Sequence, residues 1–416
     1  MFWSVAPGAG GSNRISIDQG IGRSGLKESA RLFDGIDILG DLGIGASLLG
    51  IVYLVAATIA VWSFGRQRAA APGRRPSVTI MKPVCGADPG LYENLRSFCR
   101  QAYDGPVQIV IGAHRESDPA VAIARQVIAD LPGADVALVI DGALQGSNFK
   151  ICNLANMMAV AKHEILVIAD SDMRVEPHYL DAVIGPLMAD GVGLVTCLYK
   201  GRPERGIASA LGAAFINTGF LPSVLVGKLV GADTGCFGAT MALRRSTLAE
   251  VGGLGALINQ LADDYVLSRL VRDAGYEVVI SPYVVENIVL EADLGALFRH
   301  ELRWQRTVRS ISPIGLAASV IANPVALALL ALPLSGFADG AWLALVAALA
   351  GREALIYTCS RIFGVIPLRA ALVPIRDVLS FIVLVASFCG QRVTWRDQHF
   401  QVDQRGKLTF EGDPLA

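Results

Sequence analysis

Two aspartates, Asp170 and Asp172, stand one residue apart directly after the apolar run Ile165–Ala169. Side chains alternate between the two faces of a strand, so both carboxylates can share one face where this strand ends. Carboxylate oxygens bind hard divalent cations, and a cation held there can neutralise a diphosphate leaving group. An Asp-x-Asp triplet at a strand end is more often a turn or a helix cap. The triplet alone therefore leaves both interpretations open.

Two further polar positions offer complementary chemistry. Asp118, in Glu116-Ser117-Asp118-Pro119, can accept a hydrogen bond from a nucleotide base or ribose, or it can cap a helix that opens at Pro119. Lys150, at the end of Gly146-Ser147-Asn148-Phe149-Lys150, is a point charge for a phosphate or a solvated lysine at a helix start.

The second half of the chain adds an acidic pair and a basic segment. Asp263 and Asp264 precede an amphipathic helix, where two acids complement the macrodipole. The chemical alternative makes Asp264 a general base that takes the proton of an attacking hydroxyl. Residues 300–309 are basic and amphipathic, as in a peripheral helix with snorkelling arginines. Alternatively, Arg303 binds a diphosphate and Trp304 packs against an acceptor or a sugar.

Short β-branched runs alternate with longer amphipathic stretches from Ser77 to about Pro282, which predicts an α/β domain with a mostly parallel sheet. Ligands of such sheets bind beyond the carboxyl ends of the strands, where Asp118 and Asp170 are expected. The strands are predicted at residues 78–81, 107–111, 136–140, 165–169 and 194–198, and helices at 119–131 and 149–162.

Composition indicates a membrane protein. The chain is 53% hydrophobic and 18% charged, with a mean hydropathy of +0.48. Residues 42–64 carry no charge and predict a spanning helix, whose basic end stays in the cytoplasm because four arginines follow it: Arg66, Arg68, Arg74 and Arg75. Residues 1–40, rich in Gly and Ser, predict disorder.

Charge and cysteine content exclude other classes. A net charge of −1 argues against a nucleic-acid partner. Seven scattered cysteines without a Cys-x-x-Cys pair argue against a zinc site or a disulfide framework. With five histidines in the chain, any metal is expected on carboxylates.

The last third predicts three more spans. Residues 311–338 are uncharged, with prolines that kink the helix or mark its ends, and weaker spans follow at 341–360 and 370–390. The weaker spans carry Arg352-Glu353 and Arg376-Asp377. These charged residues either are functional or face the interior of the helix bundle, or the helices are short and the charges lie at the lipid headgroups. Residues 391–416 form a tail of mixed charge.

The order Asp118, Lys150, Asp170-Ser171-Asp172, Asp263-Asp264 and His300-x-x-Arg303-Trp304 resembles the D, D, D, (Q/R)xxRW series of GT-A glycosyltransferases. Within these, the chain is most similar to the ceramide glucosyltransferase family. Further matching segments run through most of the chain: Met81-Lys82-Pro83, Asn148–Leu154, Ala262–Tyr265 and Trp395-Arg396.

Other segments are more similar to bacterial hopanoid-biosynthesis-associated glycosyltransferases of this family: Glu93–Cys99, Ala169–Asp172, Gly219–Val226, Cys236–Arg245 and His300–Trp304. That resemblance implies inverting transfer of N-acetylglucosamine from UDP-N-acetylglucosamine to a bacteriohopanepolyol. Glucosylation of ceramide with UDP-glucose is the alternative. Two residues depart from the patterns: His300 replaces the usual Gln or Arg, and the animal enzymes have Gly where Asp172 stands.

The resemblance implies a role for each motif residue. Asp118 would hold the uridine or ribose, Asp170 and Asp172 would hold Mn²⁺ or Mg²⁺ and the diphosphate, and Lys150 would face the donor phosphates. Asp264 would be the catalytic base, and Arg303 and Trp304 would close over the donor and a lipid acceptor.

The implied organisation places the catalytic domain on the cytoplasmic side of the bacterial inner membrane. Its parts are a disordered segment (1–40), a transmembrane helix (42–64), a GT-A domain (77–295), an interfacial helix with the Arg-Trp motif (296–310), transmembrane helices (311–390) and a tail (391–416). A processive polysaccharide synthase would need more spans, and an inactive membrane scaffold would not need the acids.

Overall fold

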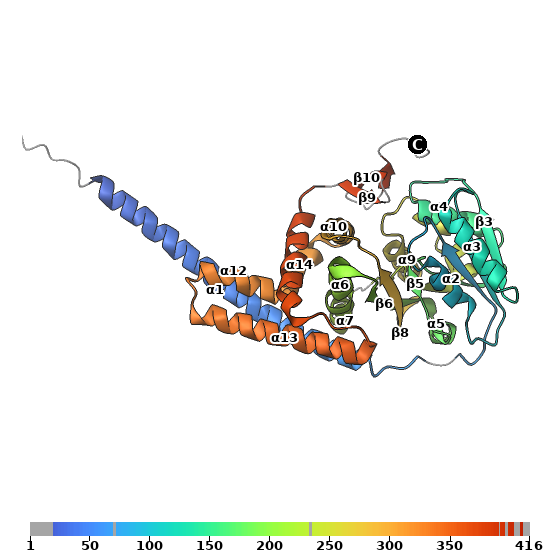
Figure 1. Cartoon of the computed structure of the whole chain (residues 1–416), viewed down its shortest axis with the longest axis horizontal. Helices are drawn as coiled ribbons and strands as arrows, with labels where there is room; N and C mark the ends of the chain where they lie inside the picture. Colours follow the sequence, from blue (N-terminus) through green and yellow to red (C-terminus); the bar gives the residue numbers. More distant parts are fainter. Residues whose placement is uncertain are drawn as a thin grey trace, which may run out of the picture.

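The computed structural model describes residues 20–69, 72–232, 235–390, 392–395, 398–402 and 408–410, with side chains described from residue 38 to residue 390 outside these gaps. Figure 1 shows an α/β domain from which a set of long helices extends. The two parts meet at α6 and α7, which lie between the sheet and the extended helices.

An eight-stranded mixed sheet organises the domain, in the order β3-β2-β1-β4-β7-β6-β8-β5. The predicted parallel arrangement holds for β3, β2, β1 and β4, whereas β7 is antiparallel to β4 and β6, and β5 is antiparallel to β8. The strands are β1 (Val78–Pro83), β2 (Val107–Ala113), β3 (Asp135–Ile140), β4 (Ile165–Ile168), β5 (Met173–Arg174), β6 (Val192–Pro203), β7 (Met241–Arg244) and β8 (Glu277–Val289).

Helices cover both faces of the sheet, so every residue of β1 and β4 is buried. One face packs against α2 (Leu91–Cys99), α3 (Pro119–Asp130) and α5 (Tyr179–Leu187). The other packs against α4 (Phe149–Met157), α8 (Arg245–Glu250) and α9 (Asp263–Asp273). The helices predicted at 119–131 and 149–162 are thus present, the second one shorter than expected.

Strand β8 runs through Pro282, where the sequence predicts the end of the regular pattern. The pairing with β6 shifts register at this point, from Ser281 opposite Cys197 to Val284 opposite Leu198. The proline therefore sits in a bulge, where a strand can lack an N–H donor. Beyond it, β6 and β8 continue side by side toward the helical part of the molecule.

A continuous apolar helical segment, not predicted as a span, follows β6. It comprises α6 (Gly206–Phe215), the π-helix η1 (Ile216–Phe220) and α7 (Leu221–Leu229), and it is long and apolar enough to cross a membrane. Asn217 ties it to the sheet, because its side-chain amide exchanges two hydrogen bonds with the backbone of Gly201 at 2.8 and 2.9 Å. Gly201 permits this approach, since a Cβ there would lie 2.7 Å from the Cα of Ala213.

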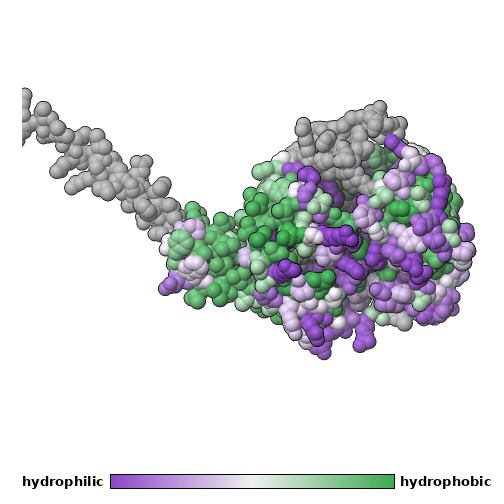
Figure 2. All heavy atoms as spheres, in the orientation of Figure 1, coloured by the Kyte–Doolittle hydropathy of each residue, from purple (hydrophilic) through white to green (hydrophobic). Residues whose placement is uncertain are grey.

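The other apolar helices are α1 (Gly20–Phe64), α13 (Asp339–Phe363) and α14 (Val373–Ser387). Three segments of suitable length and hydropathy, Ile38–Phe64, Asp339–Phe363 and Ala370–Ser387, agree with the predicted spans. Figure 2 shows hydrophobic residues covering this part and hydrophilic residues prominent on the outer surface of the domain. Helix α1 begins at Gly20, so the later part of the segment predicted to be disordered is helical. Residues 1–19 lie outside the described residues.

The segment predicted as one span at 311–338, with prolines that kink it or mark its ends, is bent near Pro324. It contains α11 (Pro313–Ala318), the 3-10 helix η3 (Ser319–Ala322) and α12 (Pro324–Leu334), with a bend of 72° between the two halves. Pro313 and Pro324 each open a helix at its first position, where their missing N–H costs nothing. Helix α12 lies along α1 and α13 (Figure 1).

Helix α10 (Leu294–Ile311), predicted at 296–310, precedes this bend. Arg306 donates to the carbonyl of Cys389 at 2.7 Å, and Arg309 donates to the carbonyls of Ser387 and Gly390, so two arginines cap the end of α14. The predicted tail begins with a small antiparallel sheet of β9 (Arg392–Trp395), β10 (Gln398–Val402) and β11 (Leu408–Phe410). Arg396 and the side chain of Trp395 lie outside the described residues.

Candidate active site

The acidic triplet follows β4, as predicted, and its first carboxylate meets Lys150. The Nζ atom of Lys150 lies 2.8 Å from Oδ1 of Asp170 and 3.2 Å from Oδ2 of Asp263. Asn148 places this lysine by capping α4, since its Oδ1 accepts from the N–H of Ile151 at 3.2 Å. Burial alone would lower the pKa of Lys150, but the Asp170 and Asp263 carboxylates raise it. The lysine is therefore a fixed positive charge between two acids.

Gly238, before β7, joins Asp170 to Asp264. The N–H of Asp170 donates to the carbonyl of Gly238 at 3.1 Å, and the N–H of Gly238 donates to Oδ2 of Asp264 at 3.0 Å. No side chain could replace this glycine without movement, because a Cβ would lie 2.5 Å from Oδ2 of Asp170. The two acids predicted to act together thus lie on either side of one residue.

Asp264 sits in the first turn of α9, and its other oxygen accepts from the N–H of Tyr265 at 2.8 Å. Burial and the charge of Asp263 raise the pKa of Asp264 from 3.8 to about 6, although Lys150 opposes this shift. A carboxylate with this pKa is mostly ionised at neutral pH and still basic enough to take a proton.

Asp172 is held by a residue of β8, the strand that pairs with β5 directly after Asp172. Its Oδ2 accepts from the side-chain amide of Asn287 on β8 at 2.8 Å. Burial and the charge of Asp170 raise the pKa of Asp172, and the charge of Lys82 lowers it. Sequence reasoning missed Asn287, because 115 residues separate it from Asp172.

Lys82 is a further site residue, predicted only as part of a motif. Its side chain is fully buried within β1, donates to the carbonyl of Asp170 and lies 3.8 Å from the ring centre of Phe98. Burial lowers the pKa of Lys82 to about 7, against the raising effect of Asp172 and Asp170. The sequence could have indicated this role, because Lys82 is a lysine inside an otherwise apolar strand. A buried ammonium group requires polar partners.

Asp118 performs the structural role that the sequence left open. Its Oδ1 accepts from the N–H of Ala120 at 2.8 Å and so caps α3. The same oxygen accepts from the N–H of Gly86 at 2.8 Å, which fixes the loop after β1. Asp118 therefore lies at the carboxyl ends of β1 and β2, and its contact with a nucleotide remains a prediction.

Arg303 and Trp304 lie on α10, beside the aromatic residues of the η1 region. The Trp304 ring stacks near Phe215, with centres 6.1 Å apart, and meets His300 edge-on at 4.3 Å. Burial and the charges of Asp264, Asp172 and Asp170 raise the pKa of Tyr199 on β6, and Arg303 lowers it. The arginine and the three acids thus act on one hydroxyl group.

His300, the residue that departs from the resembled pattern, pairs with an acid. Its Nδ1 lies 2.6 Å from Oε1 of Glu291, in the connection between β8 and α10. The other oxygen of Glu291 is buried without a hydrogen-bond partner. His300 therefore contacts both Trp304 and the segment that leads into α10.

The donor set fits a hard divalent cation only when phosphate oxygens complete it. Among the described residues, no three His, Cys, Asp or Glu side chains converge as a metal site. Mg²⁺ is commonly bound by one or two carboxylates together with water and substrate phosphates. Asp170 and Asp172 supply two such carboxylates. Burial and the charge of Asp170 both raise the pKa of Asp172, and a bound cation would offset both effects.

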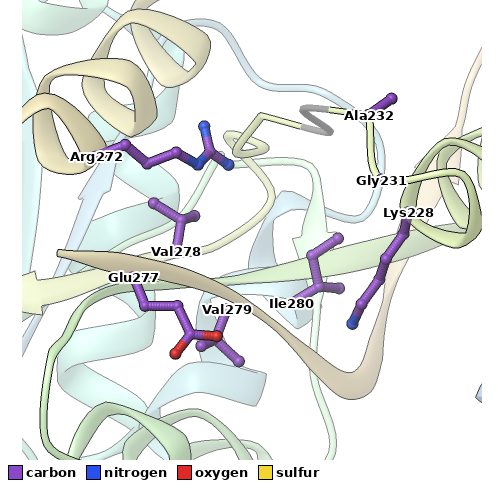
Figure 3. Close-up of a pocket in the computed structure, with 8 residues that line it drawn as sticks. All are labelled: Lys228, Gly231, Ala232, Arg272, Glu277, Val278, Val279 and Ile280. Atoms are coloured by element: carbon purple, nitrogen blue, oxygen red, sulfur yellow. The ribbon is translucent and has the colours of Figure 1, made fainter. Parts of the chain in front are cut away.

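A cavity of about 410 Å³ lies elsewhere, between the end of α7 and the start of β8 (Figure 3). Lys228, Arg272 and Glu277 are among the residues that line it. None of the predicted site residues lines this cavity, so it is separate from the acidic site.

Comparison with known proteins supports the resemblance. The sequence profile of Glycosyl transferase family 21 matches residues 44–408. Ceramide glucosyltransferase 1 of Caenorhabditis elegans is 25% identical over 283 residues, covering 68% of this chain and 60% of the relative. A ceramide glucosyltransferase of Gibberella zeae is 32% identical over 134 residues, covering 30% of this chain and 25% of the relative. The chain thus matches at most 60% of the length of these relatives.

A solved structure shows the same fold. A mannosyltransferase from Pyrobaculum calidifontis, in complex with GDP-Man and Mn²⁺, covers 84% of this chain and 99% of its own length, with 20% identity and a TM-score of 0.50. The predicted GT-A fold is thereby confirmed. Because the family profile covers most of the chain, this protein belongs to glycosyl transferase family 21.

Proposed function

We propose that the chain is a membrane-bound, inverting glycosyltransferase that transfers a sugar from a UDP-sugar to a hydroxyl group of a membrane lipid. The observation that carries the proposal is the convergence of Asp170, Lys150 and Asp264 around Gly238. An anion-binding lysine, a cation-binding carboxylate and a base with a raised pKa are the three groups that this reaction needs.

In the proposed reaction, the acceptor oxygen attacks the anomeric carbon, the bond from this carbon to the donor phosphate breaks, and UDP departs. Asp264 takes the acceptor proton, which it can do because its pKa lies near 6. Asp170 and Asp172 would hold Mn²⁺ or Mg²⁺, which when bound neutralises the diphosphate. Lys150 and Arg303 orient the donor, Trp304 packs against the sugar or acceptor, and Asp118 contacts the nucleoside.

The lipid acceptor has two candidates. Transfer of N-acetylglucosamine to a hopanoid, a bacteriohopanepolyol, rests on the segments of this sequence that resemble the bacterial enzymes, such as Cys236–Arg245. Glucosylation of ceramide rests on the curated relatives, whose names state that activity. Both acceptors stay in the bilayer, which agrees with the apolar helices beside the site.

We further propose that the catalytic domain faces the cytoplasm at a bacterial inner membrane. The support is the charge pattern at the end of α1, where Arg66 and Arg68 follow the span. The guanidinium of Arg66 lies 4.5 Å from the ring centre of Trp62, an arrangement suited to a membrane interface.

The test is a transfer assay with the purified full-length protein in detergent. UDP-N-acetylglucosamine or UDP-glucose is incubated with hopanoid or ceramide acceptors, with Mn²⁺, with Mg²⁺ or with EDTA, and both UDP and glycolipid are quantified. Metal-dependent formation of one glycolipid is expected. Glycolipid formation at full rate in EDTA would contradict the metal assignment, and its absence with every pair would contradict the proposed substrates.

A matched pair of variants separates the site from general damage. Asp170→Asn removes the carboxylate bound to Lys150 and is expected to abolish transfer. Asp135→Asn removes an exposed acid of the edge strand β3 that pairs with Lys162 at 2.8 Å, and it should leave transfer unchanged.

A further inference from the structure

Two buried ion pairs meet on adjacent residues of α14. Arg376 binds Glu301 of α10 through two parallel contacts of 2.8 and 2.7 Å. Asp377 binds Arg352 of α13, with contacts of 2.9 and 3.0 Å. All four side chains are 5% exposed or less. Three charges that the sequence placed in two predicted spans therefore face the helix bundle: Arg352, Arg376 and Asp377. The fourth, Glu353, is partly exposed and takes no part in these two pairs.

Arg376 contacts two residues next to Trp304: Glu301 on the same helix and Phe215, on which the indole ring stacks. Glu301 lies three residues before Trp304, about one turn away on the same helix. The Arg376 guanidinium also lies 5.5 Å from the ring centre of Phe215, the ring on which Trp304 stacks. A third contact, to the carbonyl of Leu211 at 3.2 Å, fixes it to α6.

Stability alone does not account for this arrangement. Replacing a buried ion pair with apolar groups of similar volume is often neutral or stabilising, because both charges lose their hydration. A planar guanidinium with two parallel bonds instead sets the distance and the angle between helices. Here it sets α10 against α6, and these helices carry the two stacked rings.

We propose that Arg376 is a positioning residue, which holds α10 so that Trp304 keeps its stacked place beside the acidic site. This inference rests on the proposed function for its kinetic consequences. Arg376 itself lies in an apolar helix and acts through Glu301 and Phe215. Its loss should therefore impair use of the acceptor in proportion to the contribution of Trp304.

The second ion pair provides a matched control. Arg352 and Asp377 are equally buried, and Asp377 lies next to Arg376 on α14. Arg352 donates to the carbonyls of Thr218 at 3.2 Å and Ala322 at 2.6 Å, in η1 and η3. Asp377→Asn should therefore disturb the bundle as much as an Arg376 variant, but without acting on α10.

A double-mutant cycle tests the proposal in the full-length protein. Arg376→Lys and Trp304→Leu are each expected to lower kcat/KM for the acceptor about 10- to 100-fold, since an ångström of misplacement costs this much. Their combination should be no worse than the more severe single variant, because both remove the same function. The losses of kcat/KM caused by Asp377→Asn and by Trp304→Leu should instead multiply when the two changes are combined. Multiplicative losses for Arg376→Lys as well would overturn the proposal.

Tryptophan fluorescence gives a readout that needs no substrate. The Trp304 contribution is the difference between the wild-type emission and that of Trp304→Leu. Arg376→Lys should red-shift this contribution and raise its acrylamide quenching, and Asp377→Asn should not. An unchanged Trp304 contribution in Arg376→Lys would overturn the inference, whereas absence of transfer by the wild type would overturn only the proposed function.

If Arg376→Lys does not fold, variants of its partner Glu301 test the same proposal. Glu301→Gln should reproduce the altered Trp304 emission. The reversed pair, Glu301→Arg with Arg376→Glu, should restore part of the lost acceptor kcat/KM. No rescue together with a normal Trp304 emission would again contradict the positioning role.

Discussion

Replacing Asp264 with asparagine should stop transfer and remove a cost to stability that grows as the pH rises. Burial and Asp263 raise the pKa of Asp264 from 3.8 to about 6. A raised pKa means that the stability contribution of the protonated group is complete below 3.8 and is lost as the pH rises through about 6. Above that pH, the ionised carboxylate disfavours the fold.

The size of the effect follows from the shift. One pKa unit corresponds to about 1.4 kcal/mol, so ionised Asp264 costs the folded state at most about 3 kcal/mol, and residual solvent exposure reduces this. Asparagine is uncharged, as the protonated acid is, but its single carbonyl oxygen replaces two carboxylate oxygens that accept separately from the N–H groups of Gly238 and Tyr265. The lost hydrogen bond lowers the stability of Asp264→Asn at every pH, so it is the stability of the variant relative to the wild type that should rise, by up to about 3 kcal/mol between pH 4 and pH 8.

Thermal unfolding in detergent across this pH range, together with transfer and UDP-binding assays, provides the measurement. Transfer should fall about 100- to 10,000-fold with UDP affinity nearly intact, as expected for a general base. Wild-type kcat/KM should decline as the pH drops through about 6. In Asp263→Asn this decline should move to lower pH, because Asp263 raises the pKa of Asp264.

Two outcomes would refute this reasoning. A stability difference between variant and wild type that stays constant from pH 4 to pH 8 would show that the carboxylate does not carry the inferred cost. Loss of UDP binding in Asp264→Asn would show that the residue holds the donor and does not act as the base.

Three further changes have expected outcomes. Gly238→Ala should displace Asp170, because Oδ2 of Asp170 would lie 2.5 Å from the new Cβ. Calorimetry should then show weaker metal-dependent UDP binding by a protein that still folds. UDP affinity equal to that of the wild type would contradict the close approach. Lys82→Met should lower turnover, because it removes the hydrogen bond to the Asp170 carbonyl. The melting temperature should change little, because methionine keeps the apolar stem. Unchanged turnover would show that Lys82 does not position Asp170 for the reaction. Arg352→Met should cost about 3–5 kcal/mol, since it leaves buried Asp377 unpaired, and Arg352→Met with Asp377→Leu should recover most of the lost melting temperature.

The strands and motifs that carry the acidic site were predictable because their signals are local. The buried run Ile165–Ile168 forms a strand, and the two acids follow its end. Asp118 before Pro119 caps a helix, which was one of the two interpretations of that residue. Burial on both faces makes such runs continuous and easily recognised.

The parts that failed depend on partners far along the chain. Asn287 lies 115 residues from Asp172, and no local pattern connects them. The segment Gly206–Leu229 falls inside the predicted GT-A domain (77–295), and no span was predicted there, although the segment is apolar enough to cross a membrane. Asp118, Asp172 and Arg303 keep their predicted chemical roles as proposals, since their position near the site does not identify a ligand.

The broken helix before α12 also constrains how the protein enters a bilayer during synthesis. Eleven residues of α-helix rise about 16 Å, roughly half of a hydrocarbon core, so α12 is too short to insert by itself. The carbonyls at its start are satisfied by later or earlier parts of the chain: Arg352 of α13 binds that of Ala322, and Ser47 of α1 binds that of Pro324. Biogenesis should therefore proceed by partitioning α1 first and then α12 with α13 as one hairpin.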